Sequence, residues 1–467
     1  MPWFSRYQPP GAATIRSMTN HPALTPAALA QRFATETQRF TATHPRSMAL
    51  AAQAAQHFLF GVPLHWMHDW PSPASLSVQQ AQGAHLTCAD GIVYSDFCLG
   101  DTGAMFGHSP APVAQAIAHQ AARGLTSMLP SEQTAEVGRL LAATFGLPRW
   151  QMALTASDAN RFVLRWARAV TQRPQLLVFD GCYHGAVDDT LVDLQAGNTV
   201  ARPSVLGNVH NHAAFTRIVP FNDLAALEAA LADRQVACLL AEPALTNCGM
   251  VLPDPGFWQA AQTLCQRYGS LLVLDETHTL STGCGGYARV HGLQPDLLVV
   301  GKAVAGGLPC AVYGFTVAMA QRMVDAKQAA PEGHSGIGTT LAGNALTIAA
   351  LHAALTHLHT PATYAPMLAL ADTLADGLRA LVAVHGMDWS VTQLGARMEL
   401  QFSGQPPRNA AEVHRASQPA LDALLHLFML NRGVLLTPFH TMLLVSPATT
   451  QGDVQRLLDG FDAFLAT

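Results

Sequence analysis

The stretch LLVLDETHTLSTGCGGYARVHGLQPDLLVVGKAVAGGLP, residues 271–309, contains two short apolar runs, and each is followed by an ionisable residue. The runs LLVL and LLVV are continuous and rich in Leu and Val, which favours strands buried on both faces of a parallel sheet. Asp275 ends the first run and Lys302 follows the second. Because ligands bind outside the carboxyl ends of the strands in such sheets, we predict that both side chains face one cleft.

Similar apolar runs precede and surround this stretch, with helical segments between most of them. We predict an α/β fold with a mostly parallel sheet between helices. The segment AVYGFTV adds an antiparallel strand, and the text after residue 349 predicts a smaller α+β domain. The predicted parallel strands are residues 151–155, 175–180, 236–242, 270–276 and 296–301.

The chain is long enough for more than one domain, and we predict three parts. Residues 1–80 form an N-terminal arm and helices that pack with the small domain. Residues 81–348 form the large domain, and residues 349–467 form the small α+β domain. The first 20 residues are expected to be a loose arm, because they lack the long apolar core of a signal peptide.

Bulk composition excludes several classes of function. Hydrophobic residues make up 49% of the chain and charged residues 12%, with a net charge of −5, so we expect neither a nucleic-acid surface nor a membrane span. The eight cysteines form no CxxC pair, and the 21 histidines form no HExxH motif, so no metal site is predicted. Unpaired cysteines indicate reduced thiols and a cytoplasmic location.

Lys302 is one of only two lysines in the chain, the other being Lys327. A partly desolvated amine at a sheet edge is nucleophilic, and a buried aspartate beside it needs a partner. Pyridoxal phosphate (PLP) requires both groups, because its aldehyde condenses with an amine and its ring nitrogen needs a carboxylate. The alternative is a surface lysine and a helix-capping aspartate.

Three further features would suit the same cofactor. The turn at residues 155–158 opens a helix and forms an anion site, the loop with Tyr183 and His184 offers a ring for stacking, and Glu242 with Asn247 ends another strand. Each has an ordinary alternative as a helix cap, a packed turn or a loop residue. The order of these features along the chain indicates a PLP site more specifically than any one of them does.

With these segments the sequence resembles the class III aminotransferases of PLP fold type I, especially the branch of the glutamate-1-semialdehyde aminomutases. The resemblance covers about residues 60–465 and implies a seven-stranded sheet. It is carried by these segments: GDTGAMFGHSPAPVAQAI, TASDANRFVLRWARAVTQR, FDGCYHG, EPALTNCGMVLPDPGFWQAAQTLCQRYGSLLVLDETHT, DLLVVGKAVAGGLP and GIGTTLAGNALTIAA.

The resemblance implies a role for each matching residue. Lys302 would hold PLP as a Schiff base and Asp275 would bind the ring nitrogen. Thr340 matches a threonine that reaches the phosphate in the other subunit, which implies a homodimer with shared active sites. The remaining cofactor-binding residues implied are Ala156 and Ser157 at the phosphate, Tyr183 and His184 at the ring, Glu242 and Asn247 on its oxygen side, and Thr277 and His278 beside it.

Three departures from the family pattern indicate a different substrate. Thr277 and His278 follow "DE" where the family usually has valine first, Thr437 precedes Pro438 where many members have arginine, and residues 47–122 contain no arginine. Arg397 would then bind a substrate anion, unless it forms an ion pair on its strand. The other predicted substrate contacts, with core packing as the alternative for each, are His68, Trp70 and Met105.

The predicted function is a PLP-dependent aminotransferase that moves an amino group between an amine or amino acid and a keto acid or aldehyde. A lyase that releases ammonia from a hydroxylated or phosphonate-bearing amine is an alternative, and so is an aminomutase of the glutamate-1-semialdehyde type. Retention of Lys302 argues against a non-catalytic protein. The lack of GxGxxG after the first strand argues against a dehydrogenase.

Overall fold

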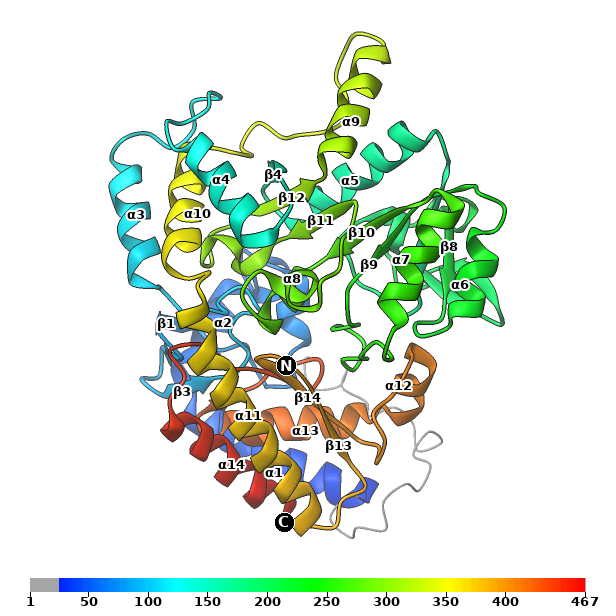
Figure 1. The fold of residues 1–467 in the computed structure, drawn as a ribbon. Helices are drawn as coiled ribbons and strands as arrows, with labels where there is room; N and C mark the ends of the chain where they lie inside the picture. Colours follow the sequence, from blue (N-terminus) through cyan, green and yellow to red (C-terminus); the bar gives the residue numbers. More distant parts are fainter. Residues whose placement is uncertain (1–24, 467) are drawn as a thin grey trace.

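The computed structural model describes residues 25–466, so the arm predicted for residues 1–20 lies outside the described residues. Figure 1 shows two unequal parts, with the larger sheet and its helices above a smaller group of helices and strands. None of the helices in this part of the chain combines the length and the apolar character needed to cross a membrane.

A seven-stranded sheet forms the centre of the large part, as predicted. One strand, β12, runs antiparallel to both of its neighbours, and the other six are parallel to one another. In spatial order the strands are β4 (Arg149–Ala153), β12 (Ala311–Phe315), β11 (Leu297–Val300), β10 (Leu271–Asp275), β9 (Val236–Ala241), β5 (Gln175–Phe179) and β8 (Thr216–Val219).

The central strands explain why continuous apolar runs predict this sheet. Every residue of β9, β10 and β11 is buried, so these strands have no polar face. The predicted antiparallel strand is confirmed as β12. The edge strand β8 was not predicted, because its four residues, TRIV, are too few and too polar to stand out.

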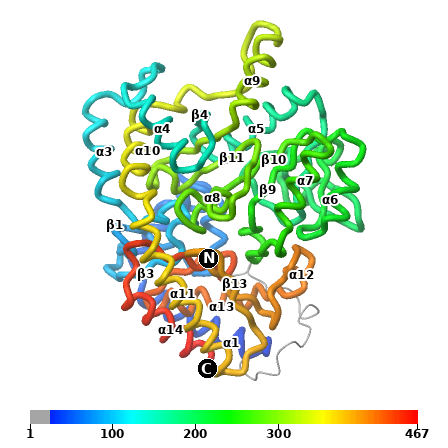
Figure 2. The backbone as a smooth tube through the Cα atoms, viewed as in Figure 1, coloured from blue at the N-terminus to red at the C-terminus, as the bar shows by residue number. Residues whose placement is uncertain are grey.

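Helices pack around this sheet (Figures 1 and 2). The helix α5 begins directly after β4 and buries Phe162 and Val163 against the sheet. The helices of this part are α3 (Ala111–Ala121), α4 (Thr134–Phe145), α5 (Ala156–Thr171), α6 (Leu224–Leu231), α7 (Phe257–Tyr268), α8 (Gly286–His291), α9 (Val317–Ala329) and α10 (Ala345–His357). A short hairpin adds β6 (Val192–Gln195) and β7 (Asn198–Ala201).

The C-terminal part combines helices with a three-stranded antiparallel sheet. The order of that sheet is β13 (Ser390–Leu394), β14 (Arg397–Gln401) and β16 (Met442–Leu444). Its helices are α11 (Pro361–Val384), α12 (Ala410–Ala416), α13 (Pro419–Leu430) and α14 (Gln451–Leu465).

The N-terminal segments lie against this C-terminal part. The helix α1 (Pro26–Thr43) packs on α13, and α2 (Pro45–Ala54) follows it. The strands β1 (Val78–Gln82), β2 (His85–Cys88) and β3 (Val93–Asp96) form a sheet that β15 (Val434–Leu435) completes. The predicted boundary at residues 80 and 81 falls inside β1, and the division into three parts stays a prediction.

Single turns of 3₁₀ helix connect several of these elements. They are η2 (Leu59–Gly61), η3 (His65–Asp69), η4 (Asp188–Thr190), η5 (His212–Ala214), η6 (Thr279–Thr282) and η7 (Lys302–Ala305). Two of them matter for the site, because η6 follows β10 and η7 follows β11. Both therefore start at the same edge of the large sheet.

Candidate active site

Lys302 and Asp275 lie at the carboxyl ends of neighbouring strands. Asp275 is the last residue of β10 and pairs in register with Val299 of β11, and Lys302 follows that strand as the first residue of η7. The Asp275 side chain is 5% exposed and the Lys302 side chain 31% exposed. The two predicted catalytic residues therefore meet the same sheet edge, one inside the core and one at its margin.

Four hydrogen bonds hold the Asp275 carboxylate. Asn160 Nδ2 donates to Oδ2 at 2.8 Å, and His184 Nδ1 lies 3.0 Å from the same oxygen. Thr277 donates to Oδ1 through its backbone N–H at 3.1 Å and its hydroxyl at 2.6 Å. These bonds fix the orientation of the carboxylate, and Asn160 on α5 is a contact that sequence reasoning missed.

The pair of Asp275 and His184 is charged. Burial alone would raise the pKa of Asp275, but the hydrogen bond from His184 and those from Thr277 and Asn160 lower it below its usual range. Burial alone would lower the pKa of His184, but the hydrogen bond to Asp275 raises it above its usual range. The side chain of His184 is completely buried, so an imidazolium faces the carboxylate inside the core.

The predicted anion site lies at the start of α5. Thr155 caps this helix by accepting the backbone N–H of Asp158, and Ala156 and Ser157 form its first turn, where amide groups lack partners within the helix. The Ser157 hydroxyl accepts the backbone N–H of Ala186 at 3.1 Å. A Cβ at Gly185, whose φ is +82°, would lie 2.0 Å from Ser157 Oγ, so this loop approaches α5 as closely as glycine allows.

The packing around Gly301 brings Ala156 and Thr277 together. A Cβ on Gly301 would lie 2.8 Å from the Ala156 Cβ and 3.3 Å from Thr277 Oγ1. The start of α5, the residue before Lys302 and the residues after β10 therefore converge on one place. This contact joins the predicted anion site to the predicted lysine and aspartate.

Tyr183 and Asn247 line a neighbouring pocket of about 680 Å³. The Tyr183 side chain is 46% exposed, as a ring contact for a ligand would be. Glu242 lies deeper, and its Oε2 accepts hydrogen bonds from the backbone and hydroxyl of Thr246. Its Oε1 is buried without a partner among the described residues, and burial raises the pKa of Glu242 to about 7.

Arg397 and His278 lie on the other side of Lys302. Arg397 is 1% exposed and its Nη2 contacts Thr102 Oγ1 and His278 Nδ1, so it is not a surface residue, and among the described residues it forms no ion pair with a carboxylate. Its Nε and Nη1 have no hydrogen-bond partner among the described residues. Asp101, which sequence reasoning left without a role, lies with Oδ2 2.6 Å from Lys302 Nζ.

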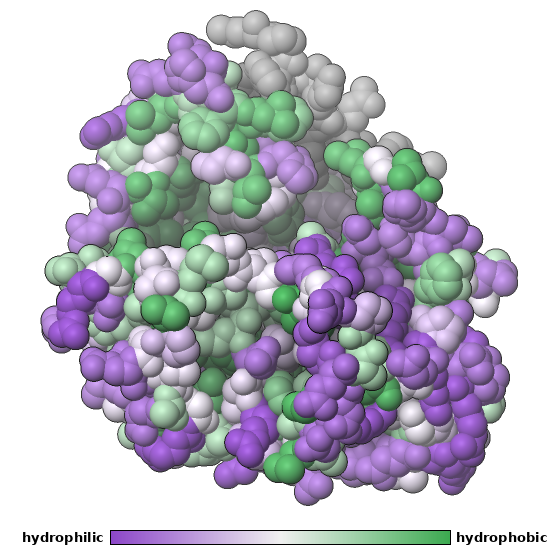
Figure 3. Space-filling model, turned by 90° about the horizontal axis from the view of Figure 1, so that it is seen from above, coloured by the Kyte–Doolittle hydropathy of each residue, from purple (hydrophilic) through white to green (hydrophobic). Residues whose placement is uncertain are grey.

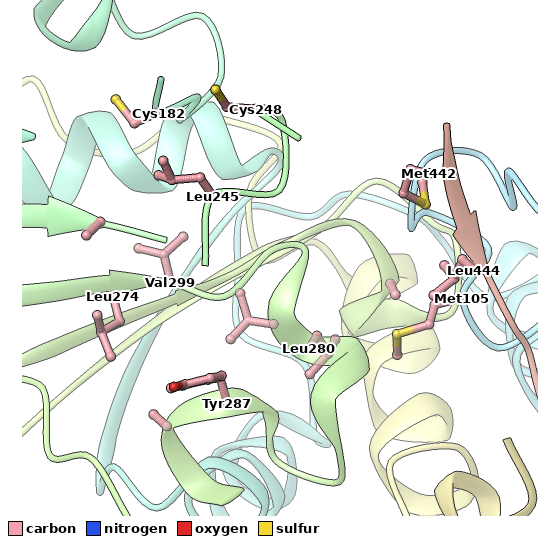
Figure 4. Packing of buried hydrophobic residues seen from close by; sticks show 14 of the residues in the cluster. Met105, Cys182, Leu245, Cys248, Leu274, Leu280, Tyr287, Val299, Met442 and Leu444 are labelled. Carbon is pink, nitrogen blue, oxygen red and sulfur yellow. The ribbon is translucent and has the colours of Figure 1, made fainter. Parts of the chain in front are cut away.

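The remaining predicted contacts lie elsewhere. Thr340 is exposed in the loop before α10. Met105 is completely buried and packs near Leu444 and Met442 (Figure 4), so its placement gives no support to a substrate contact. Trp70 meets His426 edge to face at 5.6 Å, and His68 stacks on Phe60 at 5.4 Å. Their role at a substrate stays a prediction.

Comparison with known proteins identifies the family. The family described as aminotransferase class III matches residues 67–465. A glutamate-1-semialdehyde 2,1-aminomutase from Anaeromyxobacter sp. (strain Fw109-5) is 32% identical over 396 residues, which cover 83% of this chain and 90% of that protein. One from Desulfosudis oleivorans is 34% identical over 401 residues, with coverage of 84% and 91%.

Solved structures agree with the sequence relatives. A glutamate-1-semialdehyde-aminomutase from Pseudomonas aeruginosa PAO1 is 46% identical with a TM-score of 0.92, covering 94% of this chain and 98% of that chain. A variant of that protein was solved in complex with PMP. A β-phenylalanine aminotransferase from Variovorax paradoxus is 25% identical with a TM-score of 0.84, with coverage of 94% and 98%.

The residues present fit PLP, the cofactor of this family. An amine, a buried carboxylate, a helix N-terminus and a half-exposed tyrosine lie at the edge of the large sheet. The unpartnered Glu242 Oε1 and the close approach at Gly301 leave polar groups and backbone available to a ligand. The chain therefore belongs to the class III aminotransferases, the PLP-dependent enzymes of fold type I.

Proposed function

We propose that this protein transfers an amino group between an amine or amino acid and a keto acid or aldehyde. The observation that carries the proposal is Lys302, whose amine lies within hydrogen-bond distance of Asp101 and His278 at the carboxyl end of β11. An amine that exchanges a proton with a bound substrate needs such partners. The proposal uses Asp275 as the partner of the cofactor ring and Lys302 as the residue that binds its aldehyde.

PLP, when bound, supplies a protonated ring that stabilises negative charge on the carbon next to the transferred nitrogen. The Asp275 carboxylate would keep the ring nitrogen protonated, and the His184 imidazolium keeps that carboxylate ionised. The start of α5, with Ala156 and Ser157, would bind the phosphate. Lys302 would take a proton from the substrate carbon that bears the transferred nitrogen and return it on the other side of that nitrogen, which is a 1,3-proton shift.

An aminomutase is the second candidate. The observation in its favour is that the curated relatives quoted above, and the structure at 46% identity, carry that name. Glutamate 1-semialdehyde carries a carboxylate, whereas residues 47–122 lack arginine and Arg397 is buried against Thr102 and His278. This difference in the cations around the site favours a substrate other than glutamate 1-semialdehyde. A lyase would use the same Lys302 and Asp275.

We also propose a homodimer with shared active sites in the cytoplasm. Thr340 is exposed in a loop, as expected of a residue that reaches a second subunit. Large apolar side chains are exposed at Leu125, Met128, Leu129 and Leu341, and Figure 3 shows hydrophobic patches on the face seen from above. Apolar patches of this kind favour an interface between subunits.

The test is a screen of amines and amino acids with the PLP-loaded protein, with and without pyruvate, 2-oxoglutarate or an aldehyde. Strict dependence of product on the acceptor supports an aminotransferase. Rearrangement of an amino aldehyde without any acceptor supports the aminomutase and overturns the first candidate. Release of ammonia without an acceptor supports the lyase. Lys302→Ala is the inactive control, and Lys327→Ala controls for loss of a lysine.

A further inference from the structure

Asp101 is held in place by a turn whose geometry does not depend on its side chain. Four consecutive residues have left-handed backbone angles, with φ of 46° at Leu99, 58° at Gly100, 48° at Asp101 and 81° at Thr102. Only one of them is glycine, and at each of the others the Cβ strains the left-handed backbone. Such strain persists only where the surrounding structure imposes it.

The bonds that impose this turn come from other residues. Asp96 Oδ1 accepts the backbone N–H groups of Cys98 and Leu99, each at 2.8 Å, and His108 Nε2 holds the second Asp96 oxygen at 2.7 Å. Leu99 and Thr102 are completely buried. The Asp101 side chain makes none of these bonds, so its carboxylate is available to accept a hydrogen bond from Lys302.

Lys302 Nζ has two partners, and their roles can be separated by tautomer. Asp101 Oδ2 lies at 2.6 Å and His278 Nε2 at 3.0 Å. On the far side of the imidazole, Arg397 donates to Thr102 Oγ1, and the Thr102 hydroxyl lies 2.9 Å from His278 Nδ1. Arg397 Nη2 also lies 3.1 Å from His278 Nδ1, and because arginine is only a donor, Nδ1 is the acceptor and a neutral His278 carries its proton on Nε2.

His278 is neutral in this arrangement. Burial lowers its pKa well below the usual value, and the neighbouring charge of Lys302 lowers it further. Its Nε2–H therefore points at the Lys302 nitrogen as a donor. An ammonium cannot bind that group, because both are donors, and within the described part of the chain the ammonium donates to Asp101 instead. A neutral amine can accept from His278.

We propose that Asp101 is a positioning residue that holds the ammonium form of Lys302, while His278 holds the neutral form. The amine then has a partner in each protonation state and stays in place as it gains and loses the proton. The inference rests on the proposed function for its purpose in the reaction, but its geometry concerns only Lys302, Asp101 and His278. The sign of the charge is decisive, because an uncharged side chain would hold the ammonium far less well.

The two-lysine composition allows a direct test. Full-length protein is treated with hydroxylamine and dialysed to remove PLP, and is then labelled briefly with acetic anhydride at pH 7.5. Mass spectrometry gives the ratio of labelling at Lys302 to that at Lys327, which is exposed on α9 and serves as an internal reference. In Asp101→Asn we expect this ratio to rise about fivefold, because the amine loses its ion-pair partner.

Matched variants separate charge from structure. Asp101→Glu keeps the charge and should stay closer to the parent ratio than Asp101→Asn. Asp459→Asn, at an exposed site on α14, makes the same substitution away from this turn and from Lys327 (Figure 1), and should leave the ratio unchanged. An unchanged ratio in Asp101→Asn, or equal ratios in the Asn and Glu variants, would overturn the proposal even if both variants are less stable.

A second readout uses the loaded enzyme once a substrate is known. Asp101→Asn should lower kcat about tenfold with a smaller change in KM, and Asp101→Glu should restore part of the loss. The labelling test needs neither turnover nor bound PLP. A raised labelling ratio in a protein that transfers no amino group would therefore support this inference and contradict the proposed function.

Discussion

The two carboxylates of the site differ in how they are held. Asp275 is 5% exposed and has four donors, with an imidazolium among them, whereas the Asp101 side chain is 39% exposed and contacts the partly exposed amine of Lys302. The first belongs to the packed core of the large sheet and the second to a left-handed turn at its margin. The difference teaches that one carboxylate supplies a fixed charge and that the other is a partner for an amine whose protonation state changes.

The largest expected effect comes from substitution of Lys302. Lys302→Ala removes the amine that we propose binds the cofactor and moves the proton, so we expect turnover to fall at least about 10³-fold. Because Lys302 is partly exposed, the free energy of unfolding should change by less than about 1 kcal/mol. Product formation and urea unfolding measure the two quantities. Wild-type turnover in Lys302→Ala would contradict the assignment, and Lys327→Ala is the matched control.

Substitutions in the buried pair of Asp275 and His184 should lower the free energy of unfolding. His184→Gln leaves the Asp275 carboxylate buried without its positive partner, which should lower the free energy of unfolding by about 3 kcal/mol. Asp275→Asn should cost a similar amount, and the double variant should cost clearly less than the two single changes added together. Additive costs in urea unfolding would mean that the two groups are not coupled.

The pH dependence of this pair has a definite sign. The pKa of His184 is raised above its ordinary value of 6.5, so its contribution is present below pH 6.5 and is lost as pH rises through the raised pKa. The pKa of Asp275 is lowered from 3.8, so its contribution is present above that pH and is lost as pH falls through the lowered pKa. The cost of His184→Gln should therefore be greatest near pH 5 to 6 and shrink on the alkaline side.

A smaller effect is expected at Gly185, in the loop that packs on Ser157 at the proposed phosphate site. Gly185→Ala adds a Cβ at φ +82° that would lie 2.0 Å from Ser157 Oγ, whereas Gly91→Ala has φ +81° and nothing within 4 Å. Both changes should cost about 1 kcal/mol for the backbone conformation. Only Gly185→Ala should also weaken PLP binding, which equilibrium dialysis measures. Equal PLP affinities in the two variants would separate this loop from the phosphate site.

The smallest predicted effect concerns Glu242. Burial raises its pKa to about 7, so the folded protein holds a proton that the unfolded chain releases near pH 4.5, and stability falls as pH rises between these values. Glu242→Gln removes that loss, so the free energy of unfolding of the variant relative to the parent should be higher above pH 7 than below pH 4.5. Thermal unfolding at pH 5 and pH 8 measures it, and an equal difference at both would be evidence against the raised pKa.

Much of this architecture could be predicted from local patterns. The strands β9, β10 and β11 are continuous apolar runs, and their ends place Asp275 and Lys302 at one edge. The hydrogen bond from Asn160 to Asp275 could not be predicted, because it joins residues on a helix and a strand that are far apart in the chain. The role proposed for Asp101 at Lys302 could not be predicted either, although the segment GDTGAMFGHSPAPVAQAI supports the family resemblance. No local pattern in the residues LGDT marks a left-handed turn.

By itself, the sequence determined the buried strands, the lysine and aspartate at their ends and the helix that opens after β4, since burial and periodicity act over a few residues. Only the tertiary structure decided which groups meet those two residues. His184, Asn160 and Thr277 surround Asp275, while Asp101 and His278 surround Lys302, and the segments involved are brought together by packing of the whole chain. Protonation depends on such neighbours, so the charge states in this site are a property of the fold.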